Sequence, residues 1–211
     1  MKYFSIDLEM SGLDPNTHQI LEFAAIYEDT EAQLCWEEIP KFERIINYKE
    51  LIGSPGALNL NARLLKILAG MEQVWGSSKK DYMQENNIIG INQLSGDFHQ
   101  FVYENLVKDP NFKSNKDGSI TINVAGKNFG TFDLQFINQV QGFKNKVRIS
   151  QRILDPAILY FQNFDERLPN LLDCKKRAGI KGKVTHTAIE DAWDVVEVLR
   201  NKLLNKKEII W

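Results

Sequence analysis

The first half of the chain alternates apolar and polar positions in the manner of β-strands. Residues 2–9, 19–28 and 42–47 each form a mostly apolar run of strand length, and the turn-rich segment 11–16 separates the first two. Strands joined by so short a link pair most simply in the antiparallel sense. The pattern therefore predicts an antiparallel meander at the start of the fold.

Helical spacing, with apolar residues three or four positions apart, dominates much of the remaining chain. One such segment opens with Pro169, a residue that favours the first turn of a helix. The predicted helices cover residues 57–69, 91–107, 131–141, 169–178 and 187–204.

Two further strands are predicted, over residues 120–124 and 148–154. Residues 70–90 and 111–119 are polar and are expected to be irregular. Strands first, followed by alternating strands and helices, predict an α/β fold with a mixed central sheet flanked by helices.

Composition narrows the classes of protein that fit. The 211 residues suit one domain, and 43% hydrophobic residues suffice for a core. No apolar run approaches about 18 residues, so no membrane span is expected, and residue 2 begins a strand rather than a signal peptide. Cys35 and Cys174 lack metal-ligand spacing, which predicts free thiols in a reducing, cytoplasmic setting. A net charge of −2 excludes a globally basic nucleic-acid binder, so phosphate contacts would need a local patch or a metal.

Two carboxylates stand out in the first predicted strand. Side chains two positions apart share a face, so Asp7 and Glu9 lie opposite Phe4, Ile6 and Leu8. Like charges beside a core are costly unless a cation joins them, and a hard divalent metal takes oxygen ligands. The alternative is a strand that ends at a solvated edge, and the pair alone does not decide between the two.

A third acid follows the glycine-punctuated turn that starts at Gly126. Asp133 falls in the first turn of a predicted helix, where the helix dipole favours an acid and Asn128 or Thr131 could cap. That structural role explains Asp133 by itself. However, the residue also follows the end of a core strand, where α/β sheets place their chemistry.

The last predicted helix carries a fourth acid near its apolar face. Asp191 lies on the shoulder of that face and needs a partner there, whereas Glu190, Asp194 and Glu197 are expected to point away. His186 precedes the helix in a loop, five residues before Asp191, and a loop histidine titrates near neutrality. A lone surface histidine is the alternative, and the offset to Asp191 favours a functional one.

Three motifs together resemble those of the DEDDh 3′–5′ exonucleases, which have a ribonuclease H-like fold. They are Asp-x-Glu at 7–9, Asn-x-x-x-Phe-Asp at 128–133 and His-x-Ala-x-x-Asp at 186–191. Each motif alone is weak evidence for the family. Together, their order and their predicted structural contexts match those of the family over nearly the whole chain. The stretch 6–15 is especially similar to oligoribonuclease.

The resemblance implies a single exonuclease domain over residues 1–211, with polar insertions near 70–90 and 109–119. It implies hydrolysis of single-stranded RNA or DNA from the 3′ end, releasing 5′-mononucleotides with two Mg²⁺ or Mn²⁺ ions. His186 would be the general base. The implied metal ligands, which with His186 make up the catalytic set, are Asp7, Glu9, Asp133 and Asp191.

The resemblance also implies a pocket for the 3′-terminal nucleotide. Leu8 should point away from Glu9, so Met10 and the following loop are expected to contribute backbone contacts. Phe129 is either a base-stacking aromatic or a core residue, and the two readings are equally weighted. The candidate substrate-binding residues are Leu8, Met10, Ser11, Gly12, Asn128, Phe129, Lys181 and Lys183.

A basic cluster precedes His186 and includes Lys175, Lys176, Arg177, Lys181 and Lys183. We expect it to follow the substrate backbone, and the alternative is a solvated helix end.

Other functions stay open at this point. One is a non-catalytic nucleic-acid or polymerase-binding module on the same fold, and another is a metal phosphoesterase acting on small nucleotides. The sequence favours neither RNA nor DNA, and it leaves a homodimer or a polymerase-type accessory partner undecided.

Overall fold

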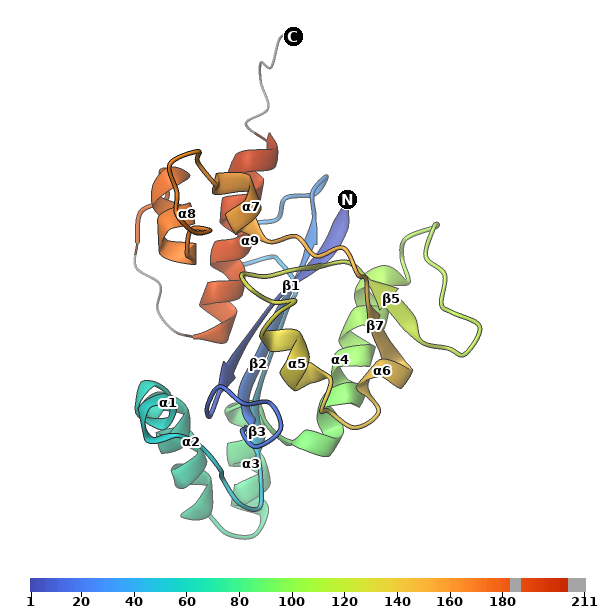
Figure 1. Cartoon of the computed structure of the whole chain (residues 1–211). Coiled ribbons are helices and arrows are strands. Elements are labelled where there is room, and N and C mark those ends of the chain that lie inside the picture. The colour runs from blue at the N-terminus through green and yellow to red at the C-terminus, as the bar shows by residue number, and fades with distance from the viewer. Residues whose placement is uncertain (183–186, 205–211) are drawn as a thin grey trace.

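The computed structural model describes residues 1–182 and 187–204 (Figure 1). Its first three strands are β1 (Lys2–Met10), β2 (Ile20–Asp29) and β3 (Lys41–Asn47). β1 pairs with β2 and β2 pairs with β3, both in the antiparallel sense. The predicted meander is confirmed, with strand ends within one residue of those expected.

Two short parallel strands complete the central sheet. β4 (Ile88–Gly90) pairs with β3, and β6 (Val124–Ala125) pairs with β1, which gives the order β4-β3-β2-β1-β6. β5 (Ile120–Ile122) and β7 (Val147–Ile149) form a separate parallel pair. The central sheet is mixed, as the order of strands and helices predicted.

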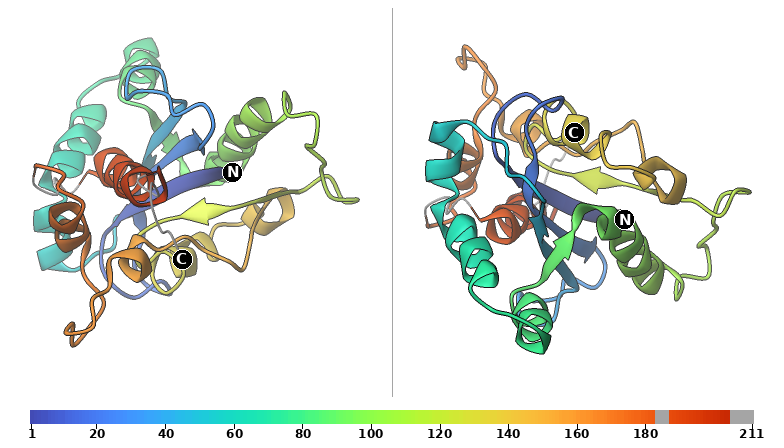
Figure 2. Two further views of the ribbon diagram at one scale, coloured as in Figure 1. Left: turned by 90° about the horizontal axis from the view of Figure 1, so that it is seen from above. Right: turned by 90° about the horizontal axis from the view of Figure 1, so that it is seen from below.

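Helices cover both faces of the central sheet (Figures 1 and 2). α9 (Ala188–Leu204) packs on β1 and β2 from one side. On the other side, α4 (Ile91–Leu106), α5 (Asp133–Ile137) and α6 (Phe143–Lys146) contribute to the largest hydrophobic cluster. The other helices are α1 (Pro55–Leu60), α2 (Ala62–Glu72), α3 (Ser77–Glu85), α7 (Pro156–Tyr160) and α8 (Leu171–Arg177).

Phenylalanine rings fill the space between the meander and α4. The tilted rings of Phe23 and Phe98 lie 4.9 Å apart, and Phe42 contacts both of them edge-on. Phe4 also contacts Phe98, at 6.2 Å. Such pairs add specific geometry to the burial of large apolar surfaces, so this layer fixes the sheet against α4.

On the opposite face, buried polar groups hold α9 against the sheet. The Ser5 hydroxyl donates to the carbonyl oxygen of Ala192 at 2.7 Å. Glu28 on β2 is 1% exposed and accepts two bonds from Arg200, at 2.5 and 2.7 Å. These contacts fix the rotation and the axial position of α9, because hydrogen bonds are directional whereas apolar packing is not.

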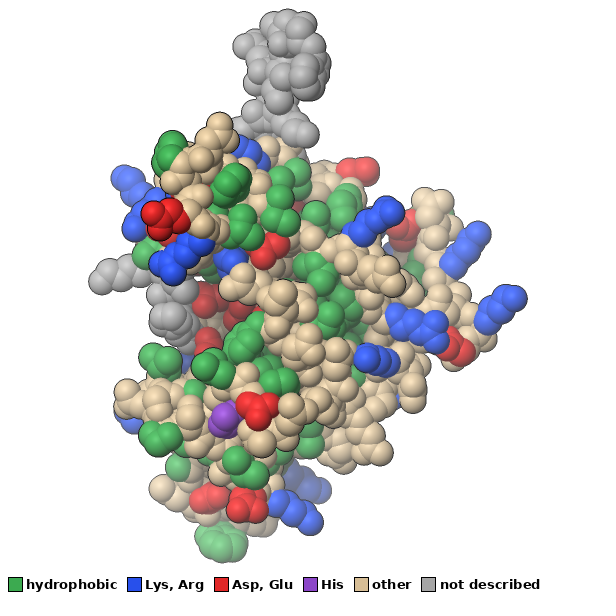
Figure 3. Space-filling model, viewed as in Figure 1, with side chains coloured by type: hydrophobic (Ala, Val, Ile, Leu, Met, Phe, Trp, Pro, Cys, Tyr) green, Lys and Arg blue, Asp and Glu red, His purple; other side chains and the backbone are tan. Residues whose placement is uncertain are grey.

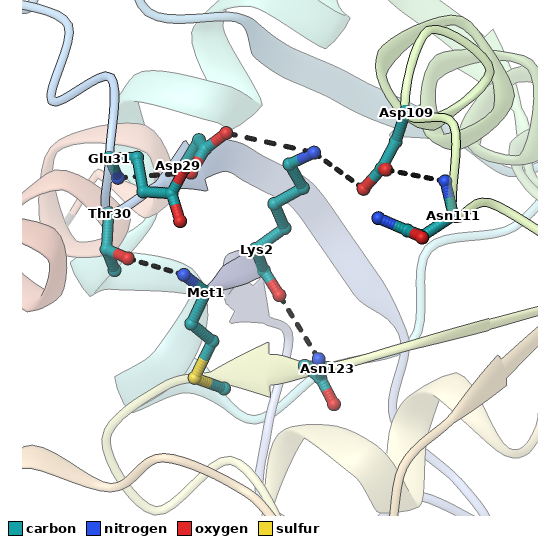
Figure 4. Close-up of polar contacts among 8 residues, drawn as sticks. All are labelled: Met1, Lys2, Asp29, Thr30, Glu31, Asp109, Asn111 and Asn123. Atoms are coloured by element: carbon teal, nitrogen blue, oxygen red, sulfur yellow. Dashed lines mark hydrogen bonds and ion pairs between the residues drawn. The ribbon is translucent and has the colours of Figure 1, made fainter.

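The start of β1 is tied to the segment that follows α4 (Figure 4). The Lys2 ammonium lies 2.6 Å from Asp109 Oδ2 and 3.9 Å from Asp29 Oδ2. The Asn123 amide donates to the carbonyl oxygen of Lys2 at 3.2 Å. These bonds anchor one end of the polar loop 109–119, which is irregular as predicted.

Two predictions for the region after β3 are wrong. The helix predicted over 57–69 is two helices that meet at Asn61, whose buried amide donates to the carbonyl oxygens of Met10 and Ala57. Residues 70–90 are not irregular, since they contain α3 and β4. β4 forms because Ile88 is buried beside Ile45 at the sheet edge.

The predicted elements after residue 119 are shorter in the structure. The strand expected over 120–124 divides at Asn123 into β5 and β6, which belong to different sheets. β7 ends at Ile149, and only Leu154 returns to the sheet, as a single bridge to Ala125. α5 ends at Ile137, and α7, which begins after its cap Asp155, was not predicted.

Composition predicted that the two cysteines are free thiols and that the chain has no membrane span. Neither Cys35, which is exposed, nor Cys174, which is buried, forms a disulfide. No helix within residues 1–182 and 187–204 has the length and apolar character needed to cross a membrane.

Removing the charge from Glu28 should destabilise the fold. In Glu28→Gln the Arg200 guanidinium keeps its partly buried position but loses its counter-charge, so the free energy of unfolding should fall by about 2–4 kcal/mol. Urea denaturation would measure the change. The control is Lys176→Gln, which removes an exposed pair to Asp173 and should cost less than about 0.5 kcal/mol. Equal losses in both variants would contradict the role given to Glu28.

Candidate functional site

The strand β1 carries two of the predicted site residues on the face that packs on α9. Asp7 and Glu9 share this face with Ser5, while Ile6 and Leu8 belong to the core on the other side. The register of β1 against β2 shifts just after Glu9. Such irregularities occur next to active sites because they end the regular pairing and redirect the following residues.

The helix α9 brings a third carboxylate to the pair. Asp191 lies in its first turn, and oxygens of Asp7, Glu9 and Asp191 all lie within 4.8 Å of one another. Ser5 contacts Ala192, the neighbour of Asp191, so the bond that docks α9 also places this carboxylate. The structure therefore brings Asp191 of the last predicted motif to both acids of the first.

A tight turn places Asp133 beside the same strand. β6 pairs with β1 only as far as Ala125, and the chain then turns at Gly126, where a Cβ atom would lie 2.8 Å from the Ile6 carbonyl oxygen. Asn128 has a left-handed φ of 58° within this turn. The turn ends at Asp133, which is 5% exposed and accepts from the backbone amide of Leu8.

Burial and mutual repulsion make ionisation of these acids unfavourable. Burial raises the pKa of Asp133 to about 7, although backbone amides act against the rise. The pKa of Glu9 is raised to about 8, mostly by burial and next by the charges of Asp191 and Glu22. The pKa of Asp7 is raised well above its ordinary value, mostly by burial and next by the charge of Asp133. The cluster is thus built for a positive partner.

The donor set fits a hard divalent cation. Carboxylate oxygens are the ligands that Mg²⁺, Mn²⁺ and Ca²⁺ prefer, and the set contains no sulfur or imidazole within the described residues. Asp133 lies outside the 4.8 Å group, but its charge acts directly on Asp7. Acidic side chains are visible in a hollow at the left of the space-filling view (Figure 3).

A fifth carboxylate of this neighbourhood, Glu22, was not predicted from the sequence. It pairs with Glu9 in the register of β1 and β2 and is fully buried. Its carboxylate accepts from Arg63 at 2.7 and 2.8 Å and from the backbone amide of Ala188 at 3.1 Å. Glu22 therefore joins β2 and α2 to the first residue of α9. The sequence feature that could have identified Glu22 is its position as the one acid within the apolar run 20–26.

The residues of the predicted terminal-nucleotide pocket lie at the end of β1 and in the segment that follows it. Leu8 is a core residue, as its position on β1 suggested, and the Met10 side chain is 8% exposed. The Ser11 hydroxyl is used internally, since it donates to Ile52 and accepts from Gln19. Gly12 lies against His18, whose ring a Cβ atom would meet at 2.4 Å. The Leu8 and Ser11 side chains thus make internal contacts, and contacts of this segment with a substrate stay a prediction.

The remaining predicted substrate residues separate into three groups. Asn128 is exposed at the turn beside the site, and Lys181 is exposed at the end of the described segment. Phe129 is 1% exposed and packs in the core, so stacking on a base is excluded in this arrangement. Lys183 and the predicted base His186 lie outside the described residues.

The basic cluster after residue 174 is largely occupied by internal ion pairs. Lys175 is 4% exposed, and its ammonium lies 2.5 Å from Asp194 Oδ1. Arg177 binds Asp165 in a bidentate pair at 2.5 and 2.7 Å. Asp194 is therefore buried, against the expectation that it points away. Amphipathic spacing places a residue on a helix, but it cannot show that another helix covers that side.

Comparison with known protein families assigns the chain to a family. The family model described as RNase_T, exonuclease, matches residues 4–115, and the chain belongs to this family. The matched region contains Asp7 and Glu9, whereas Asp133 and Asp191 follow it. No curated protein sequence matches the chain.

Solved structures show the same fold. Exonuclease I from Methylocaldum szegediense covers 99% of this chain at 14% identity, with a TM-score of 0.59. The zinc-bound complex of E. coli exonuclease I with single-stranded DNA covers 98% at 14% identity, with a TM-score of 0.58. Cell-death related nuclease 4 covers 96% at 8% identity, with a TM-score of 0.59. The chain spans 41% of the length of the two exonucleases and 64% of the nuclease.

The acids should make stability depend on pH when metal is absent. Their raised pKa values mean that, below about pH 8, the folded protein holds protons that the unfolded chain has released, so stability falls as pH rises. The melting temperature in EDTA should therefore be lower at about pH 8.5 than at about pH 6.5. Mn²⁺ should raise it more at the higher pH, because the ions bind ionised carboxylates.

Asp133→Asn is the matched variant for this measurement, since it removes one titrating acid and keeps the side-chain shape. Its melting temperature in EDTA should depend less on pH than that of the unmodified chain. A melting temperature in EDTA that is highest at alkaline pH would contradict the electrostatic description of the cluster.

Glu22 should act as a positioning residue for the carboxylates. Glu22→Gln keeps the side-chain size but weakens the bonds to Arg63 and Ala188, so we expect Mn²⁺ affinity to fall by about tenfold, in the range of outer-shell partners. Calorimetric titration would measure it, with the exposed Glu72→Gln as control. Wild-type affinity in Glu22→Gln would show that α9 is placed without this contact.

Proposed function

We propose that the chain is a metal-dependent 3′–5′ exonuclease of the DEDDh type, formed by a single domain over residues 1–211. The observation that carries the proposal is the meeting of Asp7, Glu9 and Asp191 oxygens within 4.8 Å, with Asp133 beside them. The membership of the RNase_T exonuclease family supports it. The proposal requires neither a second copy nor a polymerase partner, because all four carboxylates come from one chain.

The residues divide the proposed chemistry between them. Asp7, Glu9, Asp133 and Asp191 would hold two divalent ions, Mg²⁺ or Mn²⁺. When bound, these ions would supply Lewis-acid stabilisation of the phosphate charge and acidify a water molecule. His186 would accept the proton of the attacking water, as its ordinary pKa near neutrality suits. Attack on the terminal phosphodiester then breaks the bond to the 3′-oxygen of the preceding nucleotide and releases a 5′-mononucleotide.

The substrate we propose is a single strand with a free 3′ end. The E. coli structural neighbour was solved with single-stranded DNA and zinc, which supports DNA and a divalent ion. The likeness of residues 6–15 to oligoribonuclease supports RNA as the second substrate to test. The direct test uses 5′-labelled single strands of both kinds, at several lengths, with Mg²⁺ or Mn²⁺.

A ladder that shortens from the 3′ end and disappears with EDTA is the expected result. His186→Ala should abolish the ladder while the protein stays folded, as monitored by its thermal unfolding. Intact strands together with bound metal would overturn the proposal and favour a binding module. Cleavage of mononucleotide diesters alone would favour a small-nucleotide phosphoesterase.

Asp7 is the proposed ligand whose loss should matter most, because the charges of the three other acids all act on it. Asp7→Ala should lower kcat/KM by more than about 100-fold, beyond the loss typical of outer-shell partners. Its metal-free stability should not fall, since one buried, repelled carboxylate is removed. The control is Asp81→Asn, an exposed acid on α3, which should retain activity. Wild-type turnover by a folded Asp7→Ala would show that the metal assignment is wrong.

A further inference from the structure

Basic side chains gather on the side of the molecule formed by the loop 109–119, α6 and β7. Residues 108–152 contain eight Lys or Arg against three Asp or Glu, in a chain whose net charge is −2. Figure 3 shows Lys and Arg side chains along the right of the view that also shows the acidic hollow. We define the basic face by the exposed residues Lys113, Lys116, Lys144 and Arg148.

Most of the charge on this face is available to a ligand. Among residues 1–182 and 187–204, Lys113, Lys116 and Lys144 take part in no ion pair. Arg148 pairs with Asp117, and both side chains are 51% exposed. That pair connects the loop to β7, so Lys116, next to Asp117, is held near Arg148.

The basic face borders a hollow of about 430 Å³. Its floor is apolar and includes the buried Phe143 and Val147. Its rim carries polar groups, namely the amides of Asn138 and Asn145 and the cations Lys144 and Arg148. An apolar floor with a few amides suits a flat base, and cations at the rim suit the phosphates on either side of it.

Helix α5 connects this hollow to the candidate metal centre. Asp133 is its first residue, and Leu134, Ile137 and Asn138 line the hollow. α5 has five residues, which at about 1.5 Å each span roughly 7 Å, or about two stacked nucleotides at roughly 3.4 Å each. A strand whose 3′ end lies at the carboxylates could therefore reach the hollow within a few nucleotides.

The larger hollow beside α8 is less suited to a polyanion. It has a volume of about 730 Å³, and its lining combines Lys127, Arg167 and Arg177 with an equal number of acids. Arg177 is bound to Asp165 there. The four carboxylates of the metal centre also repel phosphate, so a strand needs unpaired cations elsewhere, and the basic face supplies them.

We propose that the basic face and its hollow bind the part of a single-stranded nucleic acid that lies 5′ to the cleaved bond. Lys113, Lys116, Lys144 and Arg148 contact its phosphates, and the hollow receives a base. This inference rests on the proposed exonuclease function, and it adds a preference for strands longer than a dinucleotide. The Lys2–Asp109 pair holds one end of the loop (Figure 4), and the Arg148–Asp117 pair holds the other, so Lys113 and Lys116 are presented on a segment that is attached at both ends.

The test compares two variants with the same change in charge. One combines Lys116→Gln and Lys144→Gln on the basic face, and the other combines Lys79→Gln and Lys80→Gln on α3. Binding of a labelled oligo-dT of about 15 nucleotides is measured in EDTA across a range of salt concentrations. For the basic-face variant, the slope of log K against log salt should become shallower by about 1.4, or about 0.7 for each lost phosphate contact. The α3 variant should keep the wild-type slope.

Turnover with metal provides the second readout. The basic-face variant should lose at least about tenfold in kcat/KM on the long strand but retain wild-type turnover of a dinucleotide, which has no upstream phosphates. Equal effects on both substrates, or unchanged binding of the long strand, would overturn the inference and assign the basic face to another polyanion. Failure of the wild-type protein to cleave either substrate would instead refute the proposed function, and the binding measurement in EDTA would still decide the inference.

Discussion

The rest of the structure depends on how four carboxylates are kept beside a hydrophobic core. Asp7, Glu9, Asp133 and Asp191 lie close together and largely out of water, so each raises the free energy of ionising its neighbours. Asn61, Arg63 and backbone amides lower this energy in part, and without a bound cation the folded state lowers it further by holding protons. The site therefore reduces the stability of the metal-free fold, and the packing around it has to supply the difference. Divalent ions would convert the same repulsion into binding energy.

That packing is polar as well as apolar. The phenylalanine layer under α4 supplies bulk burial, but it would tolerate small shifts of the sheet. On the opposite face, hydrogen bonds that Ser5 donates and that Glu22 and Glu28 accept fix α9 along its length. A shift of α9 by one residue would rotate Asp191 by about 100° away from β1, as 3.6 residues make a turn. Buried acids on β2 are therefore a structural requirement for the carboxylate cluster on β1 and α9.

The charges are also separated along the chain in a way that suits a polyanionic ligand. The four candidate metal ligands are acidic, whereas the segment from the loop 109–119 to β7 is basic. α5 lies between the two regions, with Asp133 at one end and Asn138 at the other. A phosphate chain would meet attraction on one side of this helix and, until metal is bound, repulsion on the other. The proposed binding of the strand and of the ions would thereby be coupled.

The sequence by itself determined the meander, the long helices α4 and α9, and the shared face of Asp7 and Glu9, because strand alternation and helical spacing are local properties of the chain. It could not show that Asp194 and Lys175 bury each other, that Phe129 belongs to the core, or that the run 120–124 divides between two sheets. Those outcomes depend on which segments meet in space, and partners distant in the chain leave no local pattern. Only the tertiary structure brought Glu22 to the first residue of α9, since its neighbours there come from β1, α2 and α9.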